Sequence, residues 1–133
     1  ALAFSAPQTP SDLDDGLLTA SEAAELDLAA DWVILSACNT AAPDGTPGGE
    51  GLSGLASAFL YAGARSLLVS HWPVRDDAAA LLTQGAIAAR AKDAIIGHAE
   101  SLRRSMLSLL EDPDLPGGSH PSVWAPFVVV GSN

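Results

Sequence analysis

The chain has 133 residues and is 48% hydrophobic, which suits one globular domain with a buried core. Sixteen acidic residues against six basic ones give a net charge of −10, and no Lys or Arg precedes Arg65. This charge disfavours binding to nucleic acid or to an anionic membrane surface. It leaves two interpretations open, a solvated acidic surface or an acidic groove that binds a basic peptide.

Cys38 is the only cysteine, so the chain cannot form an internal disulfide. A free thiol is typical of a reducing compartment, and we expect a cytoplasmic protein. No apolar run reaches the roughly 18–20 residues that cross a bilayer, and a signal-peptide pattern is lacking. The chain opens on the strand-like segment ALAFS without an initiating Met, which suggests a piece of something longer.

In chain order, the first elements are short. Residues 1–5 resemble a strand, and residues 6–18, rich in Pro, Ser and Asp, are expected to form a loop. The following TASE is typical of a capping box, with Thr19 at the N-cap and Glu22 three residues later. This motif predicts a short helix that ends near Leu26.

A buried strand and an amphipathic helix follow. The apolar run DWVILSA at 31–37 predicts a strand that is buried on both faces, and the Gly/Pro-rich residues 39–51 predict a loop. A helix is predicted over 52–62, with Gly63 as its C-cap. Its apolar face carries Leu52, Leu55, Ala56, Phe59 and Leu60.

The second half predicts two further strands and two helices. RSLLVSHW at 65–72 is a buried strand, and helices are expected over about 77–91 and 98–111. WAPFVVVG at 124–131 is a last strand. Alternating strands and helices predict an α/β domain with a mostly parallel sheet and helices on both faces.

Sites in parallel sheets form at the carboxyl ends of the strands. Cys38 follows one predicted strand and His71 lies at the end of the next. Cys38 is either a nucleophile or a small core residue, and His71 is either its base or a loop histidine bonded to backbone. His98 and His120 are expected to be structural. One Cys and three scattered His show no metal-ligand spacing, so we expect no metal site.

Several segments at ordered separations together resemble the CHAT domain, a family of caspase-like peptidases related to separases and caspases. They are LSACNTA at 35–41, GEGLSGLASAFLYAGARSLLVSHWPVRDDAA at 49–79, LRRSM at 102–106 and HPSVWAPFVVVG at 120–131. CHAT domains are often fused behind tetratricopeptide repeats in bacterial proteins. The resemblance implies a caspase-like three-layer α/β sandwich, of which residues 1–133 are the C-terminal part that carries the cysteine.

The resemblance also implies roles for individual residues. Cys38 matches the nucleophile of the family, and its histidine partner would fall upstream of Ala1, in a portion absent from this chain. His71 lies where the family often carries an apolar residue. Trp72 is similar in position to a wall of the substrate groove, with packing as its alternative. The carboxylate that binds a basic P1 residue would be Asp76 or Asp77, with N-capping of the next helix as the alternative for Asp76.

The resemblance therefore implies a cysteine endopeptidase domain that acts on a protein or peptide substrate and needs no metal or organic cofactor. Its expected partners are tetratricopeptide repeats or other domains of the same full-length chain, with no nucleic acid and no membrane. A non-catalytic interaction or scaffold domain attached to a repeat array is the alternative. We expect residues 1–133 alone to be inactive and to associate through exposed apolar surface.

Overall fold

The computed structural model describes residues 1–9, 11, 15–36 and 54–132. Cys38 and the loop predicted over 39–51 lie outside the described residues. The chain is a mixed α/β fold whose elements, in order, are β1 (Leu2–Ala3), β2 (Leu17–Leu18), α1 (Ala20–Ala24), β3 (Trp32–Ile34), α2 (Gly54–Tyr61), β4 (Ser66–Ser70), α3 (Asp76–Lys92), α4 (His98–Leu110), α5 (Pro121–Trp124) and β5 (Phe127–Gly131).

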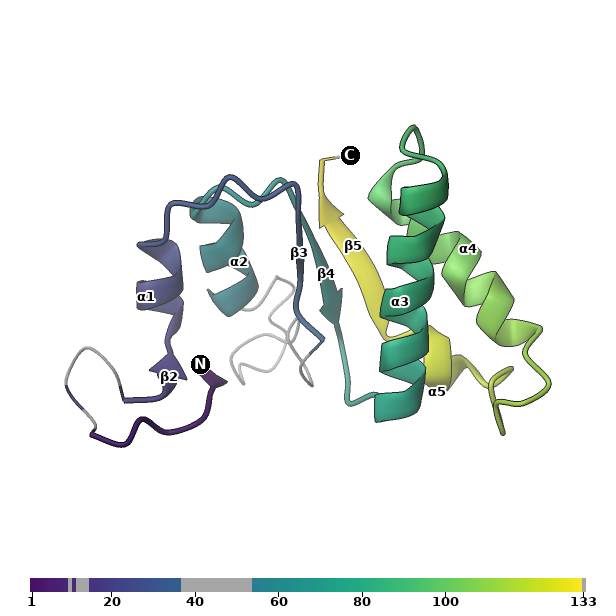
Figure 1. Cartoon of the computed structure of the whole chain (residues 1–133), viewed down its shortest axis with the longest axis horizontal. Coiled ribbons are helices and arrows are strands. Elements are labelled where there is room, and N and C mark those ends of the chain that lie inside the picture. Colours follow the sequence, from purple (N-terminus) through teal and green to yellow (C-terminus); the bar gives the residue numbers. More distant parts are fainter. Residues whose placement is uncertain (10, 12–14, 37–53, 133) are drawn as a thin grey trace, which may run out of the picture.

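The main sheet has three strands in the order β3-β4-β5 (Figure 1). β3 and β4 are parallel, with Ile34 opposite Leu68, whereas β4 and β5 are antiparallel, with Leu68 opposite Val129. The expectation of a mostly parallel sheet is therefore wrong for the described strands, which form one parallel and one antiparallel pair. The reason is that α3 leads away from the carboxyl end of β4 and α4 returns to it, so that the short α5 starts β5 at that same end.

β4 is the centre of the fold, and all five of its residues are buried. Because side chains alternate along a strand, Leu67 and Val69 enter one apolar cluster with α1 and α2, and Leu68 enters another with α3, α4 and α5. Figure 1 shows these two groups of helices on opposite sides of the sheet. The prediction of a two-sided buried strand is confirmed here.

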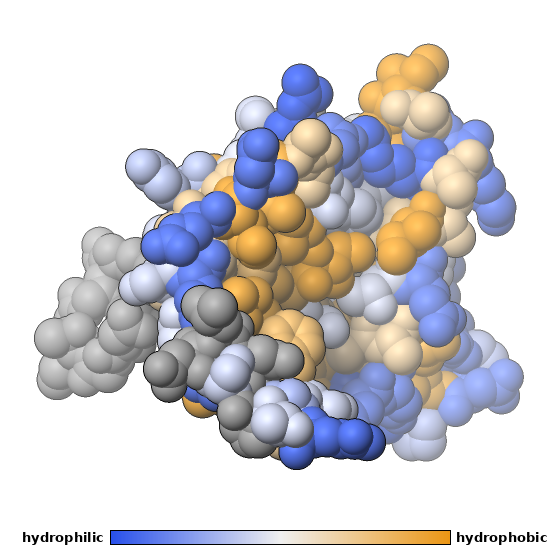
Figure 2. Space-filling view, turned by 60° about the vertical axis from the view of Figure 1, so that its left-hand side comes forward, coloured by the Kyte–Doolittle hydropathy of each residue, from blue (hydrophilic) through white to orange (hydrophobic). Residues whose placement is uncertain are grey.

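β3 is less covered than its sequence predicted. Its three residues are all half-buried, and among the described strands it pairs only with β4. The cluster on the α1 side also includes partly buried apolar side chains, Leu18, Leu28 and Val33 among them. Figure 2, which turns the α1 side forward, shows an apolar patch across the centre of that face. The described residues thus cover this side of the core only in part.

The short N-terminal elements follow the sequence closely. Thr19 caps α1, its hydroxyl accepts from the N–H of Glu22, and the Glu22 carboxylate accepts from the N–H of Thr19 at 2.7 Å. The predicted capping box is confirmed. β2 was not predicted, since Leu17 and Leu18 fall at the end of a stretch expected to be a loop. They pair with β1, which matches the predicted first strand, in an antiparallel ladder.

The helices of the second half also follow their predicted ranges closely. α3 and α4 pack against each other as an antiparallel pair (Figure 1). The last predicted strand is shorter than expected, because residues up to Trp124 form α5, capped by His120, whose Nδ1 accepts from the N–H of Ser122. Within the described part of the chain, no helix has the length and apolar character that a bilayer-spanning segment requires.

Candidate functional site

The parallel pairing of β3 and β4 brings two chain segments to one edge of the sheet. The register places Ile34 opposite Leu68, and the N–H of Leu35 donates to the carbonyl of Leu68 at 2.8 Å, so the chain leaves β3 beside the end of β4. Ser36 is the last described residue before the gap, and Cys38 follows two positions later in the sequence. The same edge carries the segment after β4, which begins at His71.

His71 and Trp72 leave the sheet at this edge and are exposed. The N–H of His71 donates to the carbonyl of Pro126 at 3.0 Å, which ties the end of β4 to the start of β5. The His71 and Trp72 rings are tilted, with centroids 6.5 Å apart. Trp72 retains 41% of its surface exposed, so its indole is available to a ligand at this edge.

Arg75 fixes the segment that follows. Its guanidinium donates to both carboxylate oxygens of Asp77, at 3.1 and 2.5 Å, and to the carbonyl of Pro116 at 2.7 Å. The hydrogen bond from Arg75 is the main reason why the pKa of the Asp77 carboxyl is lowered. Asp77 is therefore engaged inside the chain, and Arg75 links the start of α3 to the loop before α5.

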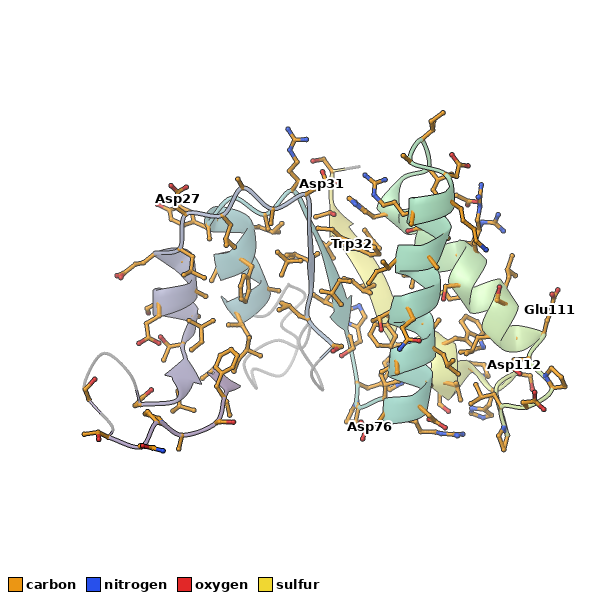
Figure 3. All side chains as sticks on the ribbon, viewed as in Figure 1. Asp27, Asp31, Trp32, Asp76, Glu111 and Asp112 are labelled. Atoms are coloured by element: carbon orange, nitrogen blue, oxygen red, sulfur yellow. The ribbon has the colours of Figure 1, made fainter. Side chains whose placement is uncertain are left out.

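Asp76 differs from Asp77 in its surroundings. It is exposed at the first position of α3, and no hydrogen bond or ion pair joins it to another described residue. The N-cap position belongs to Arg75, whose side chain makes no capping hydrogen bond, so the N-cap role considered for Asp76 is wrong. Figure 3 shows Asp76 at the end of the sheet opposite Asp31 and Trp32.

A second polar cluster lies at that opposite end, around the buried His98. Its Nδ1 is 2.8 Å from the hydroxyl oxygen of Ser66, and its Nε2 is 3.5 Å from the carboxylate of Asp31. Arg90 donates to the same carboxylate at 3.0 Å. The His98 ring stacks on Trp32, with centroids 4.6 Å apart and an interplanar angle of 28°. The cluster joins α3 and α4 to the starts of β3 and β4.

This cluster contains the residue types of a serine hydrolase triad, Ser66, His98 and Asp31, but it cannot act as one. The two ring nitrogens are exchanged, with the serine on Nδ1 and the aspartate near Nε2. Ser66 is 0% exposed, and His98 is 1% exposed, so no substrate carbonyl reaches the hydroxyl. The cluster is structural, as was expected for His98 from the sequence. The network itself was not predicted, since Asp31 and His98 lie far apart in the chain and no local pattern links them.

Burial is the main cause that lowers the pKa of His98, and the nearby charge of Arg90 lowers it further. The carboxylate of Asp31 acts in the opposite direction and raises it. The neutral imidazole is therefore the favoured form in the folded chain. Elsewhere in the described residues, His, Cys, Asp and Glu side chains form no group of three that would suit a metal ion.

Comparison with known proteins places the whole chain in one family. The profile of the CHAT domain matches residues 1–132. The tetratricopeptide repeat protein 28 of Mus musculus is 32% identical over 121 residues, which cover 88% of this chain and 4% of the relative. The protein of the same name from Homo sapiens is 30% identical over 125 residues, covering 91% and 5%.

No solved structure matches the chain. The two relatives are far longer than the matched region, so the chain spans about a twentieth of their length. The family profile nevertheless covers nearly every residue, including the segments that follow β3 and β4. The chain belongs to the CHAT domain family.

Proposed function

We propose that the chain carries the cysteine half of a caspase-like cysteine endopeptidase site, with Cys38 as the nucleophile. The observation that carries this proposal is the parallel pairing of β3 and β4. It supports a shared edge between the segment that leads to Cys38 and the segment that carries Trp72 and Asp76. Membership of the CHAT family supports the peptidase class, and helices on both faces of the sheet are compatible with a three-layer sandwich.

The chemistry follows from the residue types. The Cys38 thiolate attacks the carbonyl carbon of a peptide bond, and backbone N–H groups stabilise the negative charge on the oxygen. The nitrogen leaving group takes a proton from a histidine, and water then hydrolyses the thioester. No metal or organic cofactor is needed for these steps.

The histidine in this proposal comes from a segment upstream of Ala1. Of the described histidines, His98 and His120 are held in structural contacts, and His71 lies at a position where the family often carries an apolar residue. A strand added beside β3 would deliver such a residue to the same edge. Support for this addition comes from β3, which among the described strands pairs on one side alone, and from the apolar patch in Figure 2.

The proposed substrate is a cytoplasmic protein or peptide with a basic P1 residue. Asp76 is the carboxylate that we assign to this residue, because Asp77 is already bound by Arg75. Trp72 would form a wall of the same groove. The proposed partners within the polypeptide are tetratricopeptide repeats, because both relatives are named for them.

The test is cleavage of peptides with Arg or Lys at P1 by the full-length polypeptide. Cys38→Ala is expected to abolish cleavage, whereas His71→Gln is expected to retain it. Cleavage that survives Cys38→Ala would refute the nucleophile, and cleavage lost in His71→Gln would refute the upstream base.

A second candidate function is a non-catalytic interaction domain attached to a repeat array. The names of the relatives, which refer to repeats and to no enzyme activity, favour it. A full-length polypeptide that binds its partners equally well with and without Cys38, and that cleaves nothing, would support this second function.

A further inference from the structure

The outer face of α3 is unusually apolar for an exposed helix. Leu81 is 41% exposed and lies four residues from Gly85 and eight from Ala89 on one side of the helix, and between Asp77 and Asp93 the sequence contains no acidic residue. Sixteen acidic residues are spread over the rest of a chain with a net charge of −10. An exposed helix face without acidic side chains, in a chain that is otherwise strongly acidic, is a candidate surface for a partner. We therefore expect this face to contact another protein surface.

A shallow groove runs along this face between α3 and α4. It consists of two adjoining depressions, one of about 330 Å³ and one of about 100 Å³. Lys92 and Arg104 line the larger depression, whereas Leu81 and Asp112 line the smaller one. The residues common to both are Gly85, Ser105 and Ser108. We call the two together the α3/α4 groove.

The α3/α4 groove has a basic end and an acidic end that are arranged symmetrically. Along α4 and its C-terminal extension, Arg104 precedes Ser108 by four residues and Asp112 follows it by four. Figure 3 shows Asp112 at the lower end of α4, away from the turn between α3 and α4. Along α3, Leu81 and Ala89 are likewise four residues on either side of Gly85. A second α3/α4 groove that runs in the opposite direction would therefore set opposite charges against each other at both ends.

We propose that the α3/α4 groove pairs with the α3/α4 groove of a second copy of this chain, about a two-fold axis perpendicular to the two helices. The axis lies in the plane of contact and crosses the helices at the level of Gly85 and Ser108. It sets Arg104 against the partner's Asp112, and Leu81 against the small side chains around the partner's Ala89. Each such contact occurs twice, as in any isologous dimer.

Several observations favour a second copy as the occupant. Arg104 uses Nε for Glu100 and Nη1 for Asp93, so Nη2 takes no part in these ion pairs. Opposite charges at both ends fix one orientation, because the parallel arrangement would set Arg104 against Arg104 and Asp112 against Asp112. Apart from Lys92 and Arg104, the large depression is lined by Gly, Ala and Ser residues, which leave room for the exposed Leu81 of the other copy.

This pairing goes beyond the proposed peptidase function and does not depend on it. The α3/α4 groove lies on the other side of the sheet from α1 and α2 (Figure 1). Association through the open edge of β3 would therefore use a different surface, and substitutions can separate the two.

The test is sedimentation equilibrium of the 133-residue chain with charge-reversal variants. Arg104→Asp and Asp112→Arg are each expected to raise the dimer dissociation constant about tenfold or more. The double variant restores opposite charges at both ends and is expected to return within about threefold of the original value. Arg103→Asp is the matched control, because Arg103 also pairs with Glu100 but does not line the groove.

Leu81→Asp tests the apolar contact in the same way. It is expected to abolish the dimer, whereas Leu107→Asp, at a leucine that is 43% exposed and outside the groove, is expected to leave the dimer intact. Circular dichroism checks that each variant is folded. A chain that stays monomeric at all concentrations overturns the proposal, and so does an association that these substitutions leave unchanged.

Discussion

The imidazole of His98 lies stacked on the indole of Trp32, at a centroid distance of 4.6 Å. Trp32 is the first residue of β3, and His98 is the first residue of α4. The contact therefore joins the strand that leads toward Cys38 to a helix that follows much later in the chain. Since His98 also contacts Ser66 and Asp31, its protonation state affects how the starts of β3 and β4 are held.

We predict that the free energy of unfolding falls as the pH drops below the ordinary histidine pKa of about 6.5. The pKa of His98 is lowered in the folded chain, mainly by burial. As the pH falls toward the pKa of His98 in the folded chain, the unfolded chain binds more protons than the folded chain, and this difference favours unfolding. Well above about pH 6.5, His98 is neutral in both states, and its protonation no longer lowers the free energy of unfolding. Urea unfolding at about pH 7.5 and about pH 5.5 measures it.

His98→Gln is the variant for this prediction, with His71→Gln as its control. His98→Gln is expected to flatten the pH dependence in this range, where carboxylates with ordinary pKa values do not titrate. His71→Gln removes an exposed histidine and is expected to leave the dependence unchanged. An equal pH dependence in the original chain and in His98→Gln would contradict this account.

Two glycines with a positive φ provide a second, matched prediction. A Cβ at Gly63 would lie 2.3 Å from the carbonyl oxygen of Leu28, whereas a Cβ at Gly117 would meet nothing within 4 Å. Both substitutions with Ala carry the cost of a left-handed backbone, about 1–2 kcal/mol. Gly63→Ala is expected to cost a further ~1–3 kcal/mol because of the clash. Thermal unfolding compares them, and equal losses would show that the clash at Gly63 relaxes freely.

Neighbouring leucines in α3 provide a third prediction. Leu82 is 0% exposed and packs beneath the helix, whereas Leu81 is 41% exposed on its outer face. Leu82→Ala is expected to lower the free energy of unfolding by ~2–5 kcal/mol. Leu81→Ala is expected to change it by less than about 0.5 kcal/mol when the protein is too dilute to dimerise. A large effect at Leu81 under those conditions would mean that its side chain is covered within one copy.

The fourth prediction separates the two carboxylates at the start of α3. In the full-length polypeptide, Asp76→Asn is expected to lower kcat/KM for peptides with Arg at P1 by about tenfold or more. Peptides with a neutral P1 residue serve as the reference and are expected to be unaffected. Asp77→Asn releases Arg75 and is expected to lower kcat/KM for both peptides alike, since Asp77 is held by Arg75 and not presented to the substrate. A P1-selective loss in Asp77→Asn would reverse the assignment.

Much of the fold could be predicted from local sequence patterns. The capping box at Thr19 and the apolar run of β4 determine their own structure, because short-range hydrogen bonds and burial act within a few residues. The direction of β5 could not be predicted in this way. It depends on how α3 and α4 pack before the chain returns to the sheet, and that packing involves residues far apart in the sequence.

In the candidate site, too, only the features that depend on local sequence could be predicted. Placing Trp72 at the end of a strand required only the pattern of the strand itself. Arg75 binds both Asp77 and the carbonyl of Pro116, and Pro116 lies in a loop about forty residues later. These contacts could therefore not be predicted from the local sequence. The resemblance to the family, carried by several motifs in order, identified the domain where no single motif would have done so.

Covalent labelling directly tests the proposed role of Cys38 as the nucleophile of a peptidase site that an upstream histidine completes. The most direct measurement is mass spectrometry of the full-length polypeptide after reaction with an electrophilic peptide probe that carries Arg at P1. We expect one covalent adduct, mapped to Cys38, that disappears when the upstream histidine is replaced with Ala. An unlabelled Cys38 in the intact protein, or labelling that is unaffected by loss of the histidine, would contradict it.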